Sequence, residues 1–297
     1  MGADAPERAG DAVMAAVGAI AARIRELEPE ARADEPDAVH QLRTHVRRLR
    51  SVLAAYRPLF DEARVEHLRR AYREFGADLG VVRDLEVRVG FAEEALDGFA
   101  GETAAMRDRL VDGPRVEYGV AHARLVELMD GARAVARAAE LEAFCADPPF
   151  APGADAAAVP ALNGLLASEA KRAVRRARAA DDSLERLHRA RKAARRLRYA
   201  AEAVSAPPAE VLGDAARELG AAGERIHDLL GDQRDALVFA RHARRAGAHA
   251  AHHGETAEGY DRLASAAEST AARHLAEFPD AAQELRRARD RFAKSIG

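Results

Sequence analysis

Residues 38–60 read AVHQLRTHVRRLRSVLAAYRPLF, and residues 186–204 read RLHRARKAARRLRYAAEAV. When the first histidine of each stretch is aligned, both stretches contain the frame His-x-x-Arg-x-x-x-Arg-Arg-Leu-Arg, displaced by 148 residues. The matched pairs are His40 with His188, Arg43 with Arg191, Arg47 with Arg195, Arg48 with Arg196, Leu49 with Leu197, and Arg50 with Arg198. We infer an internal duplication, and the repeated unit is a basic helix.

Helical geometry arranges the charges of this unit into a row. At about 100° of turn per residue, His40, Arg43, Arg47 and Arg50 fall within an arc of roughly 80° on one helix. The apolar residues of the same helix form a second stripe on the adjoining arc: Leu42, Val46, Leu49 and Leu53. The cationic row is therefore expected to lie beside the core-facing row, not opposite it.

A solvated charged face is the ordinary interpretation of such a row. However, exposed helix faces usually mix the two signs for mutual support, and no Asp or Glu occurs in residues 38–60 or 186–201. These two windows hold five and seven Arg plus Lys, in a chain whose formal net charge is −3. Because such segregation costs repulsion unless an anion relieves it, we favour a surface that binds anions.

The duplicated motif resembles that of the conserved histidine α-helical domain (CHAD) family. Each copy is followed by a Gly-x-x-Arg-Asp element, Gly80 to Asp84 in the first half and Gly231 to Asp235 in the second. The resemblance covers most of the chain. It implies an all-α fold with two helical bundles related by internal pseudo-two-fold symmetry, a basic central channel between them, and binding of inorganic polyphosphate, for which sulfate or phosphate could substitute in a crystal.

The resemblance also implies which residues bind polyphosphate. The motif positions carried over are His40, Arg43, Arg47, Arg50, His188, Arg191, Arg195 and Arg198. Second-rank candidates lie to the side of the row, in the Gly-x-x-Arg-Asp elements, or on the helices that precede the motifs: Arg48, Lys192, Arg196, Arg83, Arg234, Arg23, Lys171, Arg175 and Arg178. For Arg83 and Arg234, an internal salt bridge is an equally good interpretation. The helix expected at residues 161–180 also carries Arg172 and Arg176, and spacing alone does not show which of its cations face the site.

A segment rich in proline and glycine near the middle of the chain divides it into two halves. Residues 148–160 belong to a stretch rich in Pro, Ala and Gly, which predicts a linker. It separates a first half, residues 11–147, from a second half, residues 161–297, and each half holds one motif.

Within the halves, glycines and prolines predict where helices begin and end. We expect a first helix over residues 11–28 that ends at Pro29, and a motif helix that starts from the segment 34–37. Gly80 and Gly231 are expected to end helices. A further break is expected at Gly113-Pro114.

No catalytic centre is evident. The basic helices contain no carboxylate to hold Mg²⁺, and the chain contains neither a P-loop nor an HExxH motif. We therefore expect a non-enzymatic protein without a cofactor or metal, while a phosphatase or polyphosphate-processing enzyme is the alternative from another class. The histidines at positions 242, 249, 252 and 253 include an i, i+4 pair that could hold a metal, but no acid lies among them, and we interpret them as a solvated cluster.

Nucleic-acid binding is a third hypothesis, since the arginine rows would suit a phosphate backbone. It is disfavoured because readers of single strands add aromatic platforms, and only Tyr56 and Tyr199 lie near the motifs. The single Cys145 fits a reducing compartment, and no apolar run approaches the roughly 20 residues of a membrane helix. We expect a cytoplasmic protein that does not engage membranes and could associate with polyphosphate granules.

Overall fold

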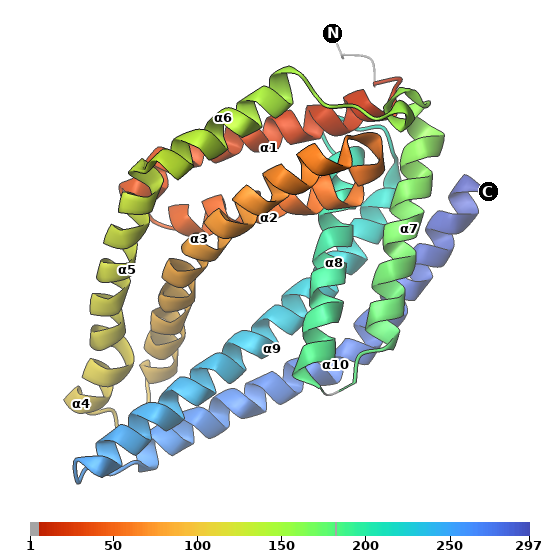
Figure 1. Cartoon of the computed structure of the whole chain (residues 1–297). Coiled ribbons are helices and arrows are strands. Elements are labelled where there is room, and N and C mark those ends of the chain that lie inside the picture. The colour runs from red at the N-terminus through yellow and green to blue at the C-terminus, as the bar shows by residue number, and fades with distance from the viewer. Residues whose placement is uncertain (1–5, 182) are drawn as a thin grey trace. The chain divides into compact units, whose positions relative to one another are not determined.

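A computed structural model describes residues 6–181 and 183–297 and confirms the all-α fold class (Figure 1). The elements follow in the order α1 (Ala9–Arg32), α2 (Ala38–Ala55), η1 (Arg57–Leu59), α3 (Glu62–Leu96), α4 (Ala104–Arg107), η2 (Asp108–Asp112), α5 (Gly113–Asp130), α6 (Ala132–Ala146), η3 (Pro152–Asp155), α7 (Ala158–Arg178), α8 (Leu184–Ser205), α9 (Asp214–His252) and α10 (Glu258–Ile296). Within the described residues, no helix is long and apolar enough to cross a membrane.

The chain forms two compact units, each assembled from separate stretches of sequence. The first unit contains the described residues up to 77 together with 128–227 and 279–297, so both motif helices belong to it. The second contains residues 78–127 and 228–278. These units do not coincide with the sequence halves 11–147 and 161–297, and the pseudo-two-fold relation between those halves stays a prediction.

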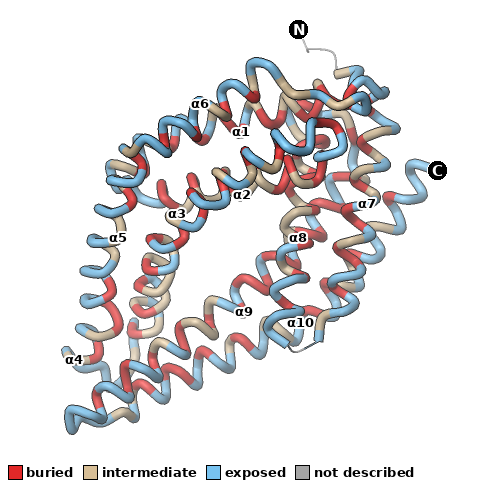
Figure 2. Tube along the Cα trace, viewed as in Figure 1, coloured by how far each residue is buried: buried red, intermediate tan, exposed pale blue. Residues whose placement is uncertain are grey.

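The core of the first unit is built from the apolar stripes of its helices. Helix α1 packs on α2, α7 packs on α8, and α2 packs on α8. The stripe of α2, including Leu42, Val46 and Leu49, is completely buried, as is Leu197 of α8 (Figure 2). The predicted core-facing rows are thus in the core, and this fixes which arcs of the two motif helices remain for the cationic rows.

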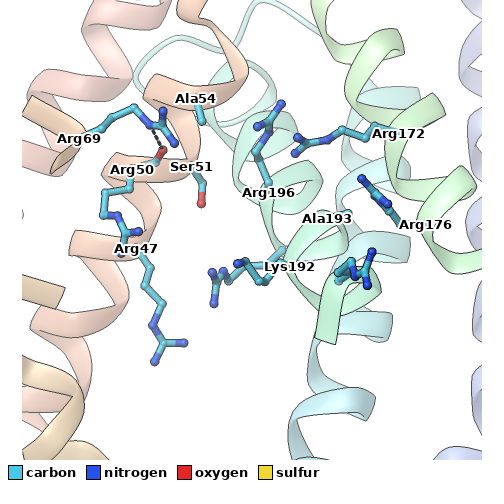
Figure 3. A pocket seen from close by; sticks show the side chains of 12 residues that line it. Arg47, Arg50, Ser51, Ala54, Arg69, Arg172, Arg176, Lys192, Ala193 and Arg196 are labelled. Carbon is cyan, nitrogen blue, oxygen red and sulfur yellow. Dashed lines mark hydrogen bonds between the residues drawn. The ribbon is translucent and has the colours of Figure 1, made fainter. Parts of the chain in front are cut away.

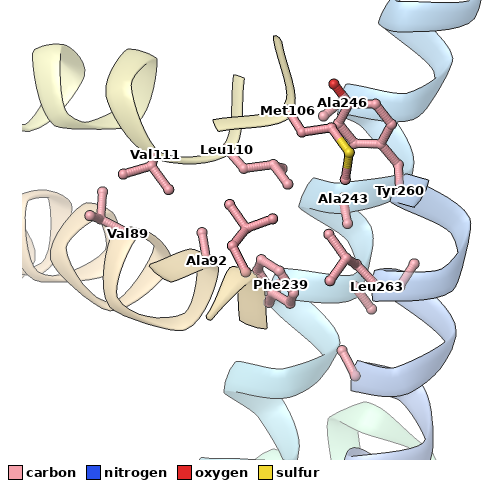
Figure 4. Close-up of a cluster of buried hydrophobic side chains, with 14 of the residues drawn as sticks. Val89, Ala92, Met106, Leu110, Val111, Phe239, Ala243, Ala246, Tyr260 and Leu263 are labelled. Carbon is pink, nitrogen blue, oxygen red and sulfur yellow. The ribbon is translucent and has the colours of Figure 1, made fainter. Parts of the chain in front are cut away.

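The second unit has its own core (Figure 4). It gathers Val89 of α3, Leu110 of η2, Phe239 of α9, and Tyr260 and Leu263 of α10. Aromatic packing contributes, because the rings of Phe91 and Phe239 stack with their centroids 6.0 Å apart. The unit therefore has a hydrophobic cluster that does not depend on the motif helices.

Several predicted helix boundaries are wrong. Pro29 does not end the first helix, which continues to Arg32 with the proline in its last turns. Gly80 and Gly231 lie inside α3 and α9. A glycine in a helix costs only about 1 kcal/mol relative to alanine, and burial of neighbours such as Leu79 and Leu230 outweighs that cost.

The starts of the two motif helices differ. At α8, Ser183 caps the helix by accepting a hydrogen bond from the backbone N–H of Arg186. At α2, Asp37 adopts a left-handed conformation with φ of 63° and makes no capping bond through its side chain, and the helix begins only after it, at Ala38. The predicted break at Gly113-Pro114 is also displaced, because α5 starts there without a gap and the separation comes at Gly131, between α5 and α6.

The predicted linker is a packed segment. Its η3 element packs against α1, and the backbone N–H of Asp61 donates to the carbonyl of Pro149 at 2.7 Å. The rings of Phe60 and Phe150 stack with centroids 5.7 Å apart. The connection between α6 and α7 is therefore an ordered part of the first unit and not a loose tether, and residues 158–160 of the predicted linker already belong to α7.

Candidate anion-binding site

The two motif helices meet near their C-terminal ends. The Tyr56 hydroxyl, just after α2, donates a hydrogen bond to the carbonyl of Ala200 on α8 at 2.7 Å. Tyr56 is fully buried, and burial raises the pKa of its hydroxyl, with Glu169 adding to the shift. The phenol is thus a neutral donor that joins the two copies of the motif.

One matched pair of motif arginines makes the same contact in both copies. Arg43 Nη1 donates to the carbonyl of Gly76 on α3 at 2.6 Å, and Arg191 Nε donates to the carbonyl of His227 on α9 at 3.3 Å. Gly76 and His227 are themselves matched, since both precede the Gly-x-x-Arg-Asp element by four residues. These two arginines therefore hold the motif helices to the helices that follow them.

A cavity of about 250 Å³ opens between the C-terminal half of α2 and the middle of α8 (Figure 3). Nine of its twelve lining residues are cationic, and the other three are Ser51, Ala54 and Ala193. The cations come from α2, α3, α7 and α8: Arg47, Arg50, Arg69, Arg172, Arg176, Arg189, Lys192, Arg195 and Arg196. Among the described residues, no carboxylate or aromatic side chain lines it.

The innermost cations of this cavity are electrostatically strained. Burial, together with the charges of Arg47, Arg191 and Arg50, lowers the pKa of Arg195 to about 10. Burial also lowers the pKa of Arg50, with the nearby charges of Arg73 and Arg69 acting in the same direction. The Nε atoms of Arg50 and Arg195 are buried without a hydrogen-bond partner. Because burying a charge without a counter-ion is costly, these two groups would gain most from a bound anion.

Other cations of the cavity already have acidic partners. Arg69 pairs with Glu66 on α3 at 2.5 Å, and Arg189 pairs with Glu185 on α8 at 2.5 Å. Glu169 of α7 bridges two further arginines: Arg172, at 3.1 Å, and Arg196, whose Nε donates to it at 2.6 Å. Among the described residues, no carboxylate pairs with Arg50 or Arg195. The lining therefore combines two arginines without a carboxylate partner, Arg50 and Arg195, with arginines that are paired with acids.

The two copies differ at the last arginine of the motif. Arg50 lines the cavity, whereas its match Arg198 pairs with Glu202 at 2.7 Å and with Glu224 at 2.8 Å. The position that corresponds to Glu202 in the first copy is Ala54, which itself lines the cavity. The position that corresponds to Glu224 is Arg73. Two local substitutions between the copies thus neutralise one arginine and leave the other available.

The remaining sequence-predicted residues lie outside this cavity. His40 is half-buried and His188 is exposed, and neither lines it. Arg48 pairs with Glu202 at 3.1 Å. It lines a separate cavity of about 110 Å³ together with Arg23 and His45.

Two more groups of candidates take other positions. On α7 the cavity is lined by Arg172 and Arg176, and not by the second-rank candidates Lys171, Arg175 and Arg178. Arg83 and Arg234 belong to the second unit, and each pairs with an acid of its own helix: Glu86 at 2.9 Å and Asp235 at 3.5 Å. The salt-bridge interpretation of these two arginines therefore agrees with the structure.

Sequence reasoning missed Arg69 and Arg189. Arg69 belongs to α3, whose mixed charges hide its orientation, and Arg189 falls outside the repeated frame because Gln41 stands at the matching position. A helical projection of α8 could have suggested Arg189, since it lies three and seven residues before Lys192 and Arg196. No sequence signal marks Arg69.

Comparison with known proteins identifies the family. The sequence model of the CHAD domain family matches residues 15–244, which is most of the chain. The chain belongs to the CHAD domain family. Its structure is similar to that of the CHAD domain from the plant Ricinus communis, with a TM-score of 0.75 and 21% sequence identity over 96% of this chain and 94% of that one. It is also similar to PptA from Streptomyces chartreusis, with a TM-score of 0.73 and 21% identity over 93% of this chain and 99% of that one.

Curated relatives of this CHAD protein are longer. The chain is 29% identical over 245 residues to the uncharacterized proteins MT2285 and Rv2226 from two strains of Mycobacterium tuberculosis. The alignment covers 80% of this chain but only 46% of those relatives. The chain thus spans about half the length of these proteins.

Proposed function

We propose that this CHAD domain binds inorganic polyphosphate, without catalysis, in the cavity between α2 and α8. The observation that carries the proposal is the lining itself, in which both motif helices contribute cations and two of them, Arg50 and Arg195, have no carboxylate partner among the described residues. Arginine suits this ligand because its forked donors match phosphate oxygens and keep their charge. A linear chain of phosphates supplies many anions to one site, as nine lining cations require.

The alternatives receive less support from the lining. Phosphoryl-transfer enzymes need a nucleophile with a base or acidic ligands for Mg²⁺, and the cavity offers no carboxylate. Single-stranded nucleic acid is bound on aromatic platforms, and no aromatic side chain lines the cavity. We therefore favour a polyanion that consists of phosphates alone, without bases. We propose that the protein binds it in the cytoplasm, including at polyphosphate granules.

Isothermal titration with polyphosphates of defined length tests this function, with ATP and homopolymeric RNA as controls at the same phosphate concentration. We expect the tightest binding for polyphosphate and an affinity that grows with chain length until the cavity is filled. Assays of phosphate release with Mg²⁺ present should show no turnover. Equal or tighter binding of RNA, or no binding of polyphosphate, would overturn the proposal.

A further inference from the structure

We propose that Glu169 is an internal counter-ion of the cavity and sets how tightly, and how selectively, a polyanion is held. The inference rests on the proposed function and adds a residue that determines affinity but does not touch the ligand. Glu169 lies on α7, is only 7% exposed, and does not line the cavity. The two arginines that it bridges, Arg172 and Arg196, do line it.

The contacts show how Glu169 acts through these arginines. Both Nε and Nη2 of Arg196 donate to its two carboxylate oxygens, and Arg172 Nη2 lies 3.1 Å from Oε2. Figure 3 shows Arg172 and Arg196 pointing toward one another from α7 and α8. Bidentate pairing fixes the planes of both groups, so the carboxylate holds two like charges side by side in the wall.

The charge of Glu169 also reduces what an anion can gain. An incoming phosphate must share these arginines with a carboxylate that already occupies Nε and Nη2 of Arg196 and Nη2 of Arg172. An orthophosphate ion that reaches this part of the wall therefore gains little. A long chain is less affected because it also reaches Arg50 and Arg195, which have no carboxylate partner. Glu169 thus favours multivalent ligands over single phosphates.

A second glutamate provides a matched control. Glu202 also bridges two motif arginines, Arg48 at 3.1 Å and Arg198 at 2.7 Å. Neither of these arginines lines the cavity of Arg47 and Arg195. Neutralising Glu202 therefore removes the same charge from a comparable bridge on the other side of the motif helices.

The test compares Glu169→Gln with Glu202→Gln by titration with a long polyphosphate of defined length and with orthophosphate. At low salt we expect Glu169→Gln to raise the affinity for the long chain about three- to tenfold, because one opposing charge is removed near the site. The slope of the logarithm of the binding constant against the logarithm of the salt concentration should steepen by about 0.7–0.9, which corresponds to one further phosphate contact. The affinity of Glu169→Gln for orthophosphate should rise by a larger factor, so its preference for the long chain over orthophosphate becomes smaller. Both affinities of Glu202→Gln should stay within twofold of wild type.

Removing the bridge could also prevent folding, because Arg172 and Arg196 would repel each other. Ala54→Glu provides the opposite change, since it introduces beside Arg50 the carboxylate that Glu202 supplies to Arg198 in the second copy. We expect it to lower polyphosphate affinity about tenfold while the helical circular dichroism is preserved.

The outcomes separate this inference from the proposed function. If the wild-type protein does not bind polyphosphate, the proposed function fails. If the wild type binds but folded Glu169→Gln shows unchanged or weaker affinity, the counter-ion role of Glu169 is wrong while the function stands. If Ala54→Glu binds as well as wild type, this cavity is not the polyphosphate site, and the role of Glu169 fails with it.

Discussion

Arg43 donates a hydrogen bond to the backbone carbonyl of Gly76 at 2.6 Å, and so joins the first motif helix to α3. The matched contact of Arg191 with His227 joins the second motif helix to α9. The same frame also carries Arg47 and Arg195, which line the cavity. Within one motif, therefore, successive arginines have different roles. Arg43 and Arg191 join the motif helices to α3 and α9, whereas Arg47 and Arg195 line the candidate binding cavity.

Replacing Arg43 and Arg191 together by Met should destabilise the protein. Each substitution removes a hydrogen bond made by a charged donor to a carbonyl, which is worth about 1–3 kcal/mol. Urea unfolding measures the loss. The control is Arg175→Met on the exposed side of α7, which should change the free energy of unfolding by no more than about 0.5 kcal/mol. An unchanged midpoint in the double variant would show that the two contacts are not structural.

Replacing Arg50 and Arg195 by Gln should weaken polyphosphate binding without destabilising the protein. The ligand-free protein should be as stable as wild type or more stable, because like charges are removed from a buried cluster. Polyphosphate affinity should fall at least tenfold, and the salt slope should decrease by about one for each lost phosphate contact. Arg48→Gln is the control, since Arg48 does not line this cavity. If Arg48→Gln weakens binding as much as the double variant does, the cavity is not the site.

Polyphosphate should stabilise the folded protein against heat. A ligand that binds only the folded state adds about 2.7 kcal/mol when its free concentration is 100 times Kd. Differential scanning fluorimetry should show a rise in Tm that disappears as NaCl is raised, because multivalent phosphate contacts release counterions. A rise in Tm that is insensitive to salt would contradict binding by the arginine cluster.

Acid should destabilise the protein through His227. This side chain is 7% exposed. Burial, with the charges of Arg191, Arg195 and Arg47, lowers its pKa to about 3. In the unfolded chain a histidine takes up its proton near pH 6.5. The unfolded state therefore binds more protons between these values, and the free energy of unfolding falls as the pH drops from about 6.5 toward 3.

The slope contributed by His227 is at most about 1.4 kcal/mol per pH unit. His227→Gln should flatten the acid limb of a plot of stability against pH. The exposed His252 provides the control, since His252→Gln should leave that limb as it is in wild type. Equal slopes in wild type and His227→Gln would refute the assignment.

The close approach of α9 to α8 depends on Gly223. A Cβ atom at this position would lie 2.9 Å from the backbone carbonyl oxygen of Ala194, so Gly223→Ala should force the helices apart and cost about 1–3 kcal/mol. Gly18 of α1 has no atom within 4 Å of the corresponding position, and Gly18→Ala should stabilise the protein by up to about 1 kcal/mol. Thermal unfolding of both variants tests the contrast, which would be lost if α8 and α9 were not packed through Gly223.

Part of the candidate site could be predicted from the motif. The repeated frame identifies Arg47, Arg50 and Arg195, which line the cavity, because helical periodicity places them beside a buried stripe. It does not separate them from Arg198, which the structure pairs with two glutamates. The glycines show that a local sequence pattern can also predict a feature that is absent from the structure. Gly80 and Gly231 are predicted as helix ends, yet both helices continue past them because the apolar residues beside them are buried.

The sequence by itself determined the duplication, the helical class and the segregation of positive charge, because these follow from spacing along the chain and from local periodicity. Only the tertiary structure decided which cations share a cavity and which are neutralised. Glu169 of α7 pairs with Arg196 of α8, Glu224 of α9 pairs with Arg198 of α8, and Arg69 reaches the cavity from α3. The charge of a site depends on distances through space, and those are set by how the helices pack.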